Sequence, residues 1–224
     1  MKIYAINGGP RKKWNTATML EHFLKGAASV GNHVETETIH LFDLKYTGCI
    51  SCYACKRGGP GYGKCAVKDD IQALLRDLPL ADGVVFGSPI YFHDITAQLR
   101  GFLERLVYQY LSFEKGEANL APKPLPIAMI YTMNVTGESM RQSGYQAVLA
   151  HMEQYLGRIF QTAPEQIFAF NTYQYKNYQD YKASYWNEPE KAAWHKNQFP
   201  LDCQAAFDAG KRMASQNESG AQAS

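Results

Sequence analysis

Four of the five cysteines in this chain lie in one short segment, at Cys49, Cys52, Cys55 and Cys65. A [4Fe–4S] cluster is held by four thiolates, and three cysteines in a tight run with a fourth further along can supply them. Zinc sites more often use paired C-x2-C knuckles, so this staggered run fits zinc less well. The segment therefore predicts a cluster site, and it leaves open four thiols that hold no metal or form a disulfide.

A second group of residues that could bind a ligand follows the first apolar run, residues 2–6. Glycines there let the backbone approach an anion, Arg11 and Lys13 add positive charge, and Asn15 and Thr16 can cap the following helix while donating hydrogen bonds. The N–H groups at a helix N-terminus also attract anions. The loop matches neither G-x-G-x-x-G nor G-x-x-x-x-G-K-[ST], which disfavours a dinucleotide fold and a P-loop ATPase. A monophosphate site fits better, with an ordinary solvated turn as the alternative. Its expected residues are Gly9, Pro10, Arg11, Lys13, Asn15 and Thr16.

Two more loops could contact a flat ligand, because each follows a buried strand. Ligands of doubly wound sheets bind beyond the carboxyl ends of the strands. The first of these loops offers apolar contact and free backbone N–H groups for the edge of a heterocycle, and the second gives a weaker signal. The expected contact residues are Ser88, Pro89, Ile90, Tyr91, Thr132 and Asn134. No side chain in these loops is predicted to act as a nucleophile.

Strand-like and helix-like patterns alternate along the chain and would position these loops. Strands are expected at residues 2–6, 34–41, 83–86, 126–131 and 166–170. Amphipathic patterns predict helices around residues 20–27, 69–78, 99–106, 148–159 and 202–215. Such alternation implies right-handed crossovers and one parallel sheet covered by helices on both faces. We therefore predict an α/β fold.

The motifs occur in a recognisable order over most of residues 1 to 160. They are Gly8-Gly9-Pro10-Arg11 with Asn15-Thr16, the cysteine segment, Lys68-Asp69-Asp70 and Gly87-Ser88-Pro89-Ile90-Tyr91. This order resembles the NADPH-dependent FMN reductase family, and within it is most similar to the iron-sulfur flavoproteins. The resemblance implies a flavodoxin-like three-layer αβα sandwich with a five-stranded parallel sheet in the order 2-1-3-4-5. It also implies FMN, NAD(P)H as co-substrate, and a homodimer or homotetramer with the flavin near a subunit interface. The FMN phosphate would lie on residues 9–16 and the isoalloxazine ring against residues 88–91.

Two positions depart from the family pattern. Gly9 stands where the family usually has Ser, so a hydroxyl donor is lost and only the backbone N–H remains for a phosphate. Nine residues separate Cys55 from Cys65, a longer gap than is usual in the iron-sulfur flavoproteins. The glycine-rich insert between them is expected to loop out and still present Cys65.

The whole chain is expected to form one domain. Residues 1–170 would make the FMN-binding part, with a cysteine-rich loop at residues 45–68. Residues 171–216 hold an aromatic arm and a C-terminal helix of the same domain, and residues 217–224 are expected to be a frayed tail. The tyrosines and tryptophans of the arm suit packing either on a partner subunit or on its own domain. Cys203, inside the last helical pattern, is expected to be an inert core residue.

The composition argues against several classes of protein. There are 23 Lys and Arg against 21 Asp and Glu, a net charge of +2, so electrostatic capture of nucleic acid is not expected. The apolar stretches are far shorter than the ~20 residues of a membrane helix. Gly and Pro interrupt the start of the chain where a signal peptide has its apolar region. We therefore expect a cytoplasmic protein that binds neither nucleic acid nor membranes.

These features together predict an NAD(P)H-dependent reductase of FMN, quinones or similar small-molecule acceptors. A first alternative is an iron-sulfur flavoprotein that passes electrons from a ferredoxin-like donor through a [4Fe–4S] cluster to FMN. A second is a flavodoxin-type carrier that binds FMN but turns over no small substrate. Flavodoxins tend to be shorter and acidic, which favours an enzyme here. A zinc-binding interaction module, which would be colourless, is a further alternative.

Overall fold

A parallel five-stranded sheet forms the centre of the computed structural model, which describes residues 1–222 and the side chains of residues 1–217. The strand order is β2-β1-β3-β4-β5, and every neighbouring pair is parallel. This confirms the predicted flavodoxin-like order. The strands are β1 Lys2–Asn7, β2 Glu35–His40, β3 Gly83–Pro89, β4 Ile127–Thr132 and β5 Glu165–Ala169.

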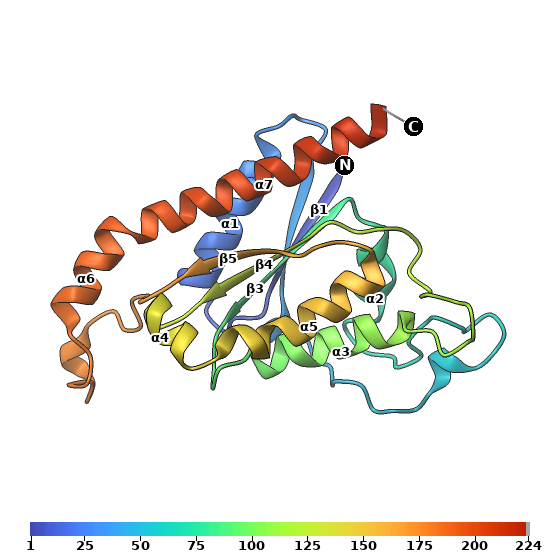
Figure 1. Ribbon diagram of the computed structural model, residues 1–224, viewed down its shortest axis with the longest axis horizontal. Helices are drawn as coiled ribbons and strands as arrows, with labels where there is room; N and C mark the ends of the chain where they lie inside the picture. The colour runs from blue at the N-terminus through green and yellow to red at the C-terminus, as the bar shows by residue number, and fades with distance from the viewer. Residues whose placement is uncertain (223–224) are drawn as a thin grey trace.

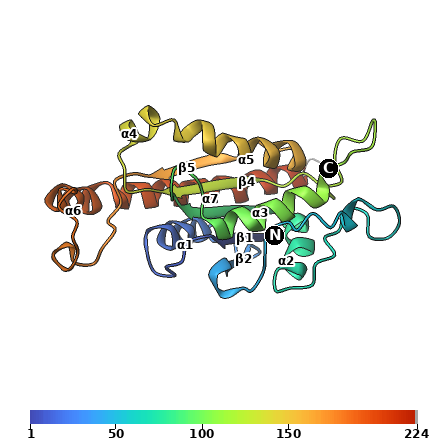
Figure 2. The same cartoon turned by 90° about the horizontal axis from the view of Figure 1, so that it is seen from below.

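Helices cover both faces of the sheet because alternate strand residues are apolar in both directions (Figures 1 and 2). Ile3 and Ala5 of β1 pack under α1 Asn15–Ala28 and α7 Phe199–Gln222. Ile6 of the same strand belongs to the opposite core. That second core lies under α2 Gln72–Asp77, α3 Ala97–Tyr110 and α5 Tyr145–Phe160. Continuous burial of β3 and β4 is typical of strands covered on both faces.

The contact between α1 and α7 depends on glycine. A Cβ added at Gly26 of α1 would lie 1.9 Å from the backbone oxygen of Phe207, and one added at Gly210 of α7 would lie 1.9 Å from that of Phe23. The two backbones therefore touch directly. This contact joins the C-terminal half of α1 to α7.

The C-terminal helix is longer than predicted. The expected helix at residues 202–215 spans Phe199–Gln222 in the structure, so residues 217–222 of the expected frayed tail are helical. Asn217 anchors this end, because its Nδ2 donates to the carbonyl of Asp82 (2.7 Å). Residues 223 and 224 lie outside the described residues.

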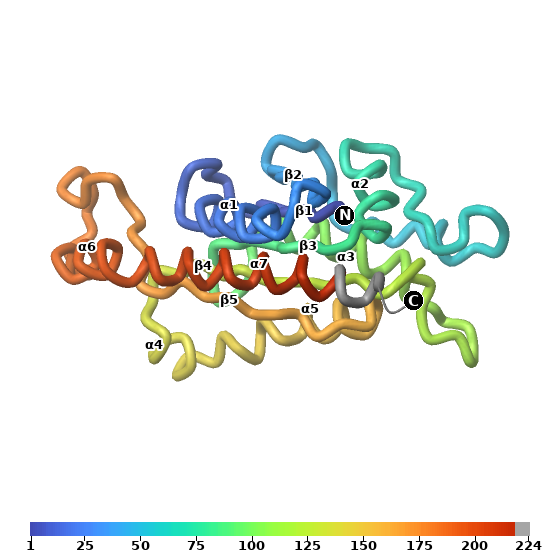
Figure 3. Tube along the Cα trace, turned by 90° about the horizontal axis from the view of Figure 1, so that it is seen from above, coloured from blue at the N-terminus to red at the C-terminus, as the bar shows by residue number. Residues whose placement is uncertain are grey.

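Two segments extend from opposite ends of the sandwich (Figures 1 and 3). The arm that follows β5 carries a 3-10 turn, Tyr178–Asp180, and helix α6 Glu188–Asn197. The cysteine segment, with the 3-10 turn Ala54–Lys56, lies at the other end. A short helix, α4 Gly137–Gln142, follows β4 and was not expected. None of the described helices combines the length and the apolar character needed to span a bilayer.

Candidate functional site

The carboxyl ends of the strands surround an open cleft, whose empty volume of about 660 Å³ includes space open to solvent. Loops after β1, β3, β4 and β5 contribute its walls. The lining residues are Gly9, Pro10, Arg11, Trp14, Asn15, Thr16, Pro89, Ile90, Tyr91, Thr132, Met133, Asn134, Thr172, Tyr173 and Gln174. Ten of the twelve residues predicted to contact the cofactor are among them. The structure thus brings together loops that are far apart in the sequence.

Close backbone packing at Gly8 positions the first loop. The Gly8 N–H donates to the Gly87 carbonyl of β3 (2.8 Å), and the Thr96 hydroxyl donates to the Gly8 carbonyl (2.6 Å). A Cβ on Gly8 would lie 2.7 Å from Cβ of Leu99 in α3. The loop therefore lies flat against β3 and α3, and it leads directly into α1.

The N-terminus of α1 is open toward the cleft. Its N-cap residue is Trp14, which has extended backbone and makes no side-chain capping bond. The first bond to this cap residue runs from the Thr18 N–H to the Trp14 carbonyl (2.8 Å). The N–H groups of Asn15, Thr16 and Ala17 therefore have no acceptor within the helix and can bind an anion. Asn15 does not cap the helix, as its Nδ2 donates to the Tyr173 carbonyl instead (2.9 Å).

One backbone donor expected for a phosphate is already in use. The Gly9 N–H donates to Oδ1 of Asn7 (2.8 Å), so the expectation that it remains available is wrong. A Cβ on Gly9 would lie 3.1 Å from this Oδ1 and 3.2 Å from Cδ of Pro89. Glycine lets the two loops approach one another at this point.

The floor and far wall of the cleft hold two polar features that a ligand could use. Oγ1 of Thr16 and Oγ1 of Thr132 are 2.7 Å apart, so one hydroxyl donates to the other and the acceptor's own hydrogen is left for another partner. Oδ1 of Asn134 is buried and has no hydrogen-bond partner among the described residues. Its Nδ2 donates to Oε1 of Gln174 (3.0 Å). Buried acceptors are nearly always satisfied, so this oxygen points to a donor on a ligand or water.

Residues after β5 form a wall that sequence reasoning missed. The Tyr173 carbonyl accepts from Nε1 of Trp14 (3.1 Å) as well as from Asn15, and the Gln174 carbonyl accepts from Nη1 of Arg11 (2.7 Å). A hydrogen bond to Glu188 and, to a smaller extent, burial raise the pKa of Tyr173 to about 12. The missed lining residues are Trp14, Met133, Thr172, Tyr173 and Gln174. Position directly after a strand was the signal that could have found the last three.

Two predicted residues do not line the cleft. Lys13 is exposed outside it. Ser88 is fully buried, where its hydroxyl donates to the Pro89 carbonyl (2.7 Å) and accepts from the Thr96 N–H (3.0 Å). Ser88 therefore shapes the loop after β3 while its neighbours Pro89, Ile90 and Tyr91 face the cleft.

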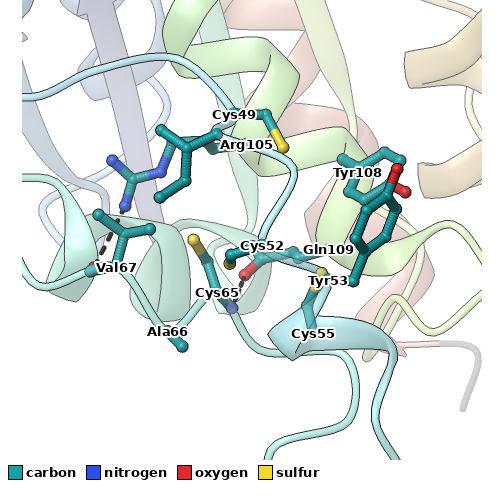
Figure 4. Close-up of a pocket in the computed structure, with 11 residues that line it drawn as sticks. Cys49, Cys52, Tyr53, Cys55, Cys65, Ala66, Val67, Arg105, Tyr108 and Gln109 are labelled. Atoms are coloured by element: carbon teal, nitrogen blue, oxygen red, sulfur yellow. Dashed lines mark hydrogen bonds between the residues drawn. The ribbon is translucent and has the colours of Figure 1, made fainter.

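The four clustered cysteines line a second cavity, with an empty volume of about 350 Å³ (Figure 4). All four are free thiols, and burial raises the pKa of Cys55. Among the side chains that the structure describes, no three from His, Cys, Asp or Glu are grouped so as to hold a metal ion. The four thiols line one shared cavity, and the described residues show neither a zinc site nor a cluster site there. Four thiols around a cavity are the donor set that a larger cluster requires.

A buried arginine completes this second cavity. Arg105 of α3 lies at the cavity and pairs with the Asp69 carboxylate. Burial lowers the pKa of Arg105, but hydrogen bonds to Asp69 and Cys65 outweigh it and raise that pKa. The guanidinium is therefore a permanent positive charge beside a thiol.

Comparison with known proteins agrees with this geometry. The family model described as NADPH-dependent FMN reductase matches residues 1–174. The chain belongs to the NADPH-dependent FMN reductase family. An iron-sulfur flavoprotein of Methanocaldococcus jannaschii is 38% identical over 105 residues, which cover 47% of this chain and 51% of that protein. One from Methanosarcina thermophila is 30% identical over 107 residues, covering 48% and 53%. The chain thus matches only about half the length of these relatives.

Solved structures show the same fold at low sequence identity. An NAD(P)H:quinone oxidoreductase from Methanothermobacter marburgensis superposes with a TM-score of 0.67 at 16% identity, covering 95% of this chain and 96% of that one. An FMN-dependent NADH-azoreductase from Bacillus anthracis, in complex with FMN, gives a TM-score of 0.62 at 15% identity, covering 96% and 100%. The flavodoxin-like architecture is therefore confirmed by both topology and comparison.

Proposed function

We propose that this protein is an FMN-dependent oxidoreductase that takes electrons from NAD(P)H and passes them to a quinone, free flavin or similar small acceptor. The observation that carries the proposal is that an uncapped helix N-terminus and an apolar, partly aromatic wall face the same cleft. An anionic tail and a flat ring require those two surfaces together. Family membership supports FMN as that ligand.

The residues of the cleft divide into two groups. The N–H groups of Asn15 and Thr16 would bind the phosphate, with the Arg11 guanidinium adding a charge at the rim. The backbone and side chains of Pro89, Ile90 and Tyr91 would lie against the ring. Lys13 and Ser88 do not line the cleft, so neither is proposed to contact the cofactor.

Bound FMN would supply the redox chemistry by accepting a hydride and releasing electrons to an acceptor. The protein would bind, orient and shield that group. The lining residues that the structure describes include no Asp, Glu, His or Cys, so no side chain there offers a proton near neutral pH. The unsatisfied Oδ1 of Asn134 would accept from an N–H on the ring edge and fix its orientation.

An iron-sulfur route is a second candidate function, favoured by the four free thiols around one cavity. The curated relatives named above are called iron-sulfur flavoproteins. In this version Cys49, Cys52, Cys55 and Cys65 would hold a [4Fe–4S] cluster that exchanges electrons with a ferredoxin-like donor and with FMN. Assembly as a homodimer or homotetramer belongs to the same proposal.

Anaerobic purification followed by spectroscopy and turnover tests both versions. We expect flavin absorption bands and oxidation of NADH or NADPH when a quinone is added. Bound FMN with no turnover would refute the reductase and support a flavodoxin-type carrier, and colourless protein after FMN supplementation would refute both. A brown shoulder with iron and sulfide would establish the cluster. Cys49→Ala should then lose iron and keep FMN, whereas Cys203→Ala, in the α7 core, should keep both.

A further inference from the structure

Arg105 holds both ends of the cysteine segment. Its Nη1 donates to the carbonyl of Thr47 (3.3 Å), two residues before Cys49, and its Nη2 donates to the carbonyl of Val67 (3.3 Å), two residues after Cys65. The same guanidinium pairs with Asp69. One side chain of α3 thus closes the loop that carries all four thiols.

Further contacts fix the loop against the C-terminal half of α3. The Cys65 N–H donates to Oε1 of Gln109 (3.0 Å), one turn beyond Arg105, as Figure 4 shows. Nζ of Lys56 donates to the carbonyls of Tyr108 (2.5 Å) and Leu111 (2.5 Å). The thiols are therefore arranged around their cavity by hydrogen bonds, without help from a disulfide.

The Arg105–Asp69 pair presents its positive end to the thiols. Arg105 lines the cavity and is only 2% exposed, whereas Asp69 is not among the lining residues. Nε of Arg105 and Oδ1 of Asp69 are buried without a hydrogen-bond partner. A buried, incompletely satisfied cation beside four thiols is the arrangement expected where an anionic group is to be held.

We propose that Arg105 is a positioning residue for the cysteine site: it shapes the loop before any metal binds, and its fixed charge balances the negative charge of a thiolate-bound group. The nature of that group rests on the iron-sulfur proposal above. One-electron reduction, by dithionite in a titration, adds one negative charge to the cavity. A fixed positive charge stabilises the reduced state, so it raises the midpoint potential.

Amide hydrogen exchange tests the shaping role on full-length protein purified with a chelator. In Arg105→Gln we expect faster exchange across residues 47–67, including the Cys65 amide. Arg105→Lys keeps the charge but cannot bond to both ends of the loop, so its exchange rates should fall between those of Arg105→Gln and the wild type. The control Arg76→Gln removes the same charge from an exposed site on α2 and should match the wild type. Unchanged exchange in Arg105→Gln would overturn the proposal that Arg105 holds the two ends of the loop together.

Redox titration of reconstituted protein tests the charge. Arg105→Gln should lower the midpoint potential and Asp69→Asn should raise it, because these variants remove opposite charges of one pair. A purely structural role predicts damage to the site by both variants but no opposed shifts. Potentials that do not move, or that move in the same direction, would overturn the charge role. Wild-type protein that takes up no iron and sulfide would refute the iron-sulfur proposal and the charge role with it. Amide exchange would still test whether Arg105 holds the two ends of the loop together.

Discussion

Replacing Lys191 with Met should remove a pH dependence from the stability of the protein. Lys191 lies on α6 and is 2% exposed. Its Nζ donates to the carbonyl of Asn134 (2.9 Å) and to Oδ1 of Asn171 (2.7 Å), and it lies 4.8 Å from the centre of the Trp186 ring. These partners are neutral, and burial lowers the pKa of Lys191 from 10.5 to about 8. This buried amine braces the arm against the loop that carries Asn134 at the cleft.

The magnitude follows from linkage between proton binding and folding. A pKa reduced from 10.5 to about 8 corresponds to a cost of about 3 kcal/mol for keeping the charged amine in the folded state, at about 1.4 kcal/mol per pKa unit. That cost is complete below pH 8, where the amine is charged in both states. It fades as pH rises toward 10.5, because the folded protein loses its proton first. The free energy of unfolding should therefore rise by roughly 1 kcal/mol between pH 7 and pH 9 from this group alone.

Urea unfolding at several pH values between 7 and 9.5 measures this effect. The quantity to follow is the wild-type free energy of unfolding minus that of Lys191→Met, because tyrosines and thiols titrate alike in both proteins. Lys196→Met, on the exposed side of the same helix, serves as the control and should show no such trend. A difference between wild type and Lys191→Met that stays constant with pH would refute the reasoning.

Three further predictions concern the α1–α7 contact, the cleft and the core. Gly26→Ala would place Cβ 1.9 Å from a backbone oxygen of α7 and should lower the free energy of unfolding by roughly 1–3 kcal/mol. The control Gly58→Ala, which has open space around it, should leave that free energy unchanged. Equal midpoints of urea unfolding for the two variants would contradict this prediction. Arg11→Gln should weaken FMN binding roughly tenfold through loss of a charge-assisted contact, whereas Lys13→Gln should not. Fluorescence titration measures the FMN affinity, and equal affinities for the two variants would count against the proposed phosphate position. Tyr131→Phe removes the hydroxyl that donates to the buried Glu153 carboxylate of α5 (2.5 Å) and should lower the free energy of unfolding by roughly 1–3 kcal/mol. Thermal or urea unfolding measures this change, and a variant as stable as the wild type would be the contrary result.

Local sequence patterns were enough to predict the sheet and most of the cleft. Buried strands such as Gly83–Pro89 are continuous apolar runs that end at glycine and proline, so both the strand and its ligand loop are visible in one short stretch. Parallel strands then bring those loops to one edge of the sheet. This is why Arg11, Ile90 and Thr132 were expected together and do line one cleft.

Features that depend on contacts between distant segments were not predictable in this way. The wall formed by Tyr173 and Gln174 exists because the arm folds back onto the start of α1, at a separation of about 160 residues. The use of the Gly9 N–H by Asn7 is a detail of loop geometry. The extension of α7 is likewise stabilised by a bond from Asn217 to a carbonyl before β3. None of these leaves a periodic pattern in the sequence.

The cysteine site, too, was predictable from the sequence only in part. All four thiols were located from their spacing, and the structure places them around one cavity. Arg105 and Gln109, which hold the loop, lie on a helix about 40 residues further along the chain. Their role emerges only when α3 is packed beside the segment.

Amide exchange with and without FMN tests the central claim most directly, because it reports both binding and its location. We predict saturable binding of one FMN per chain, with slower exchange in residues 9–18, 88–91, 132–134 and 172–174. Exchange across residues 49–65, at the opposite end of the molecule, should stay the same. Failure to bind FMN, or protection confined to segments outside the cleft, would contradict the account.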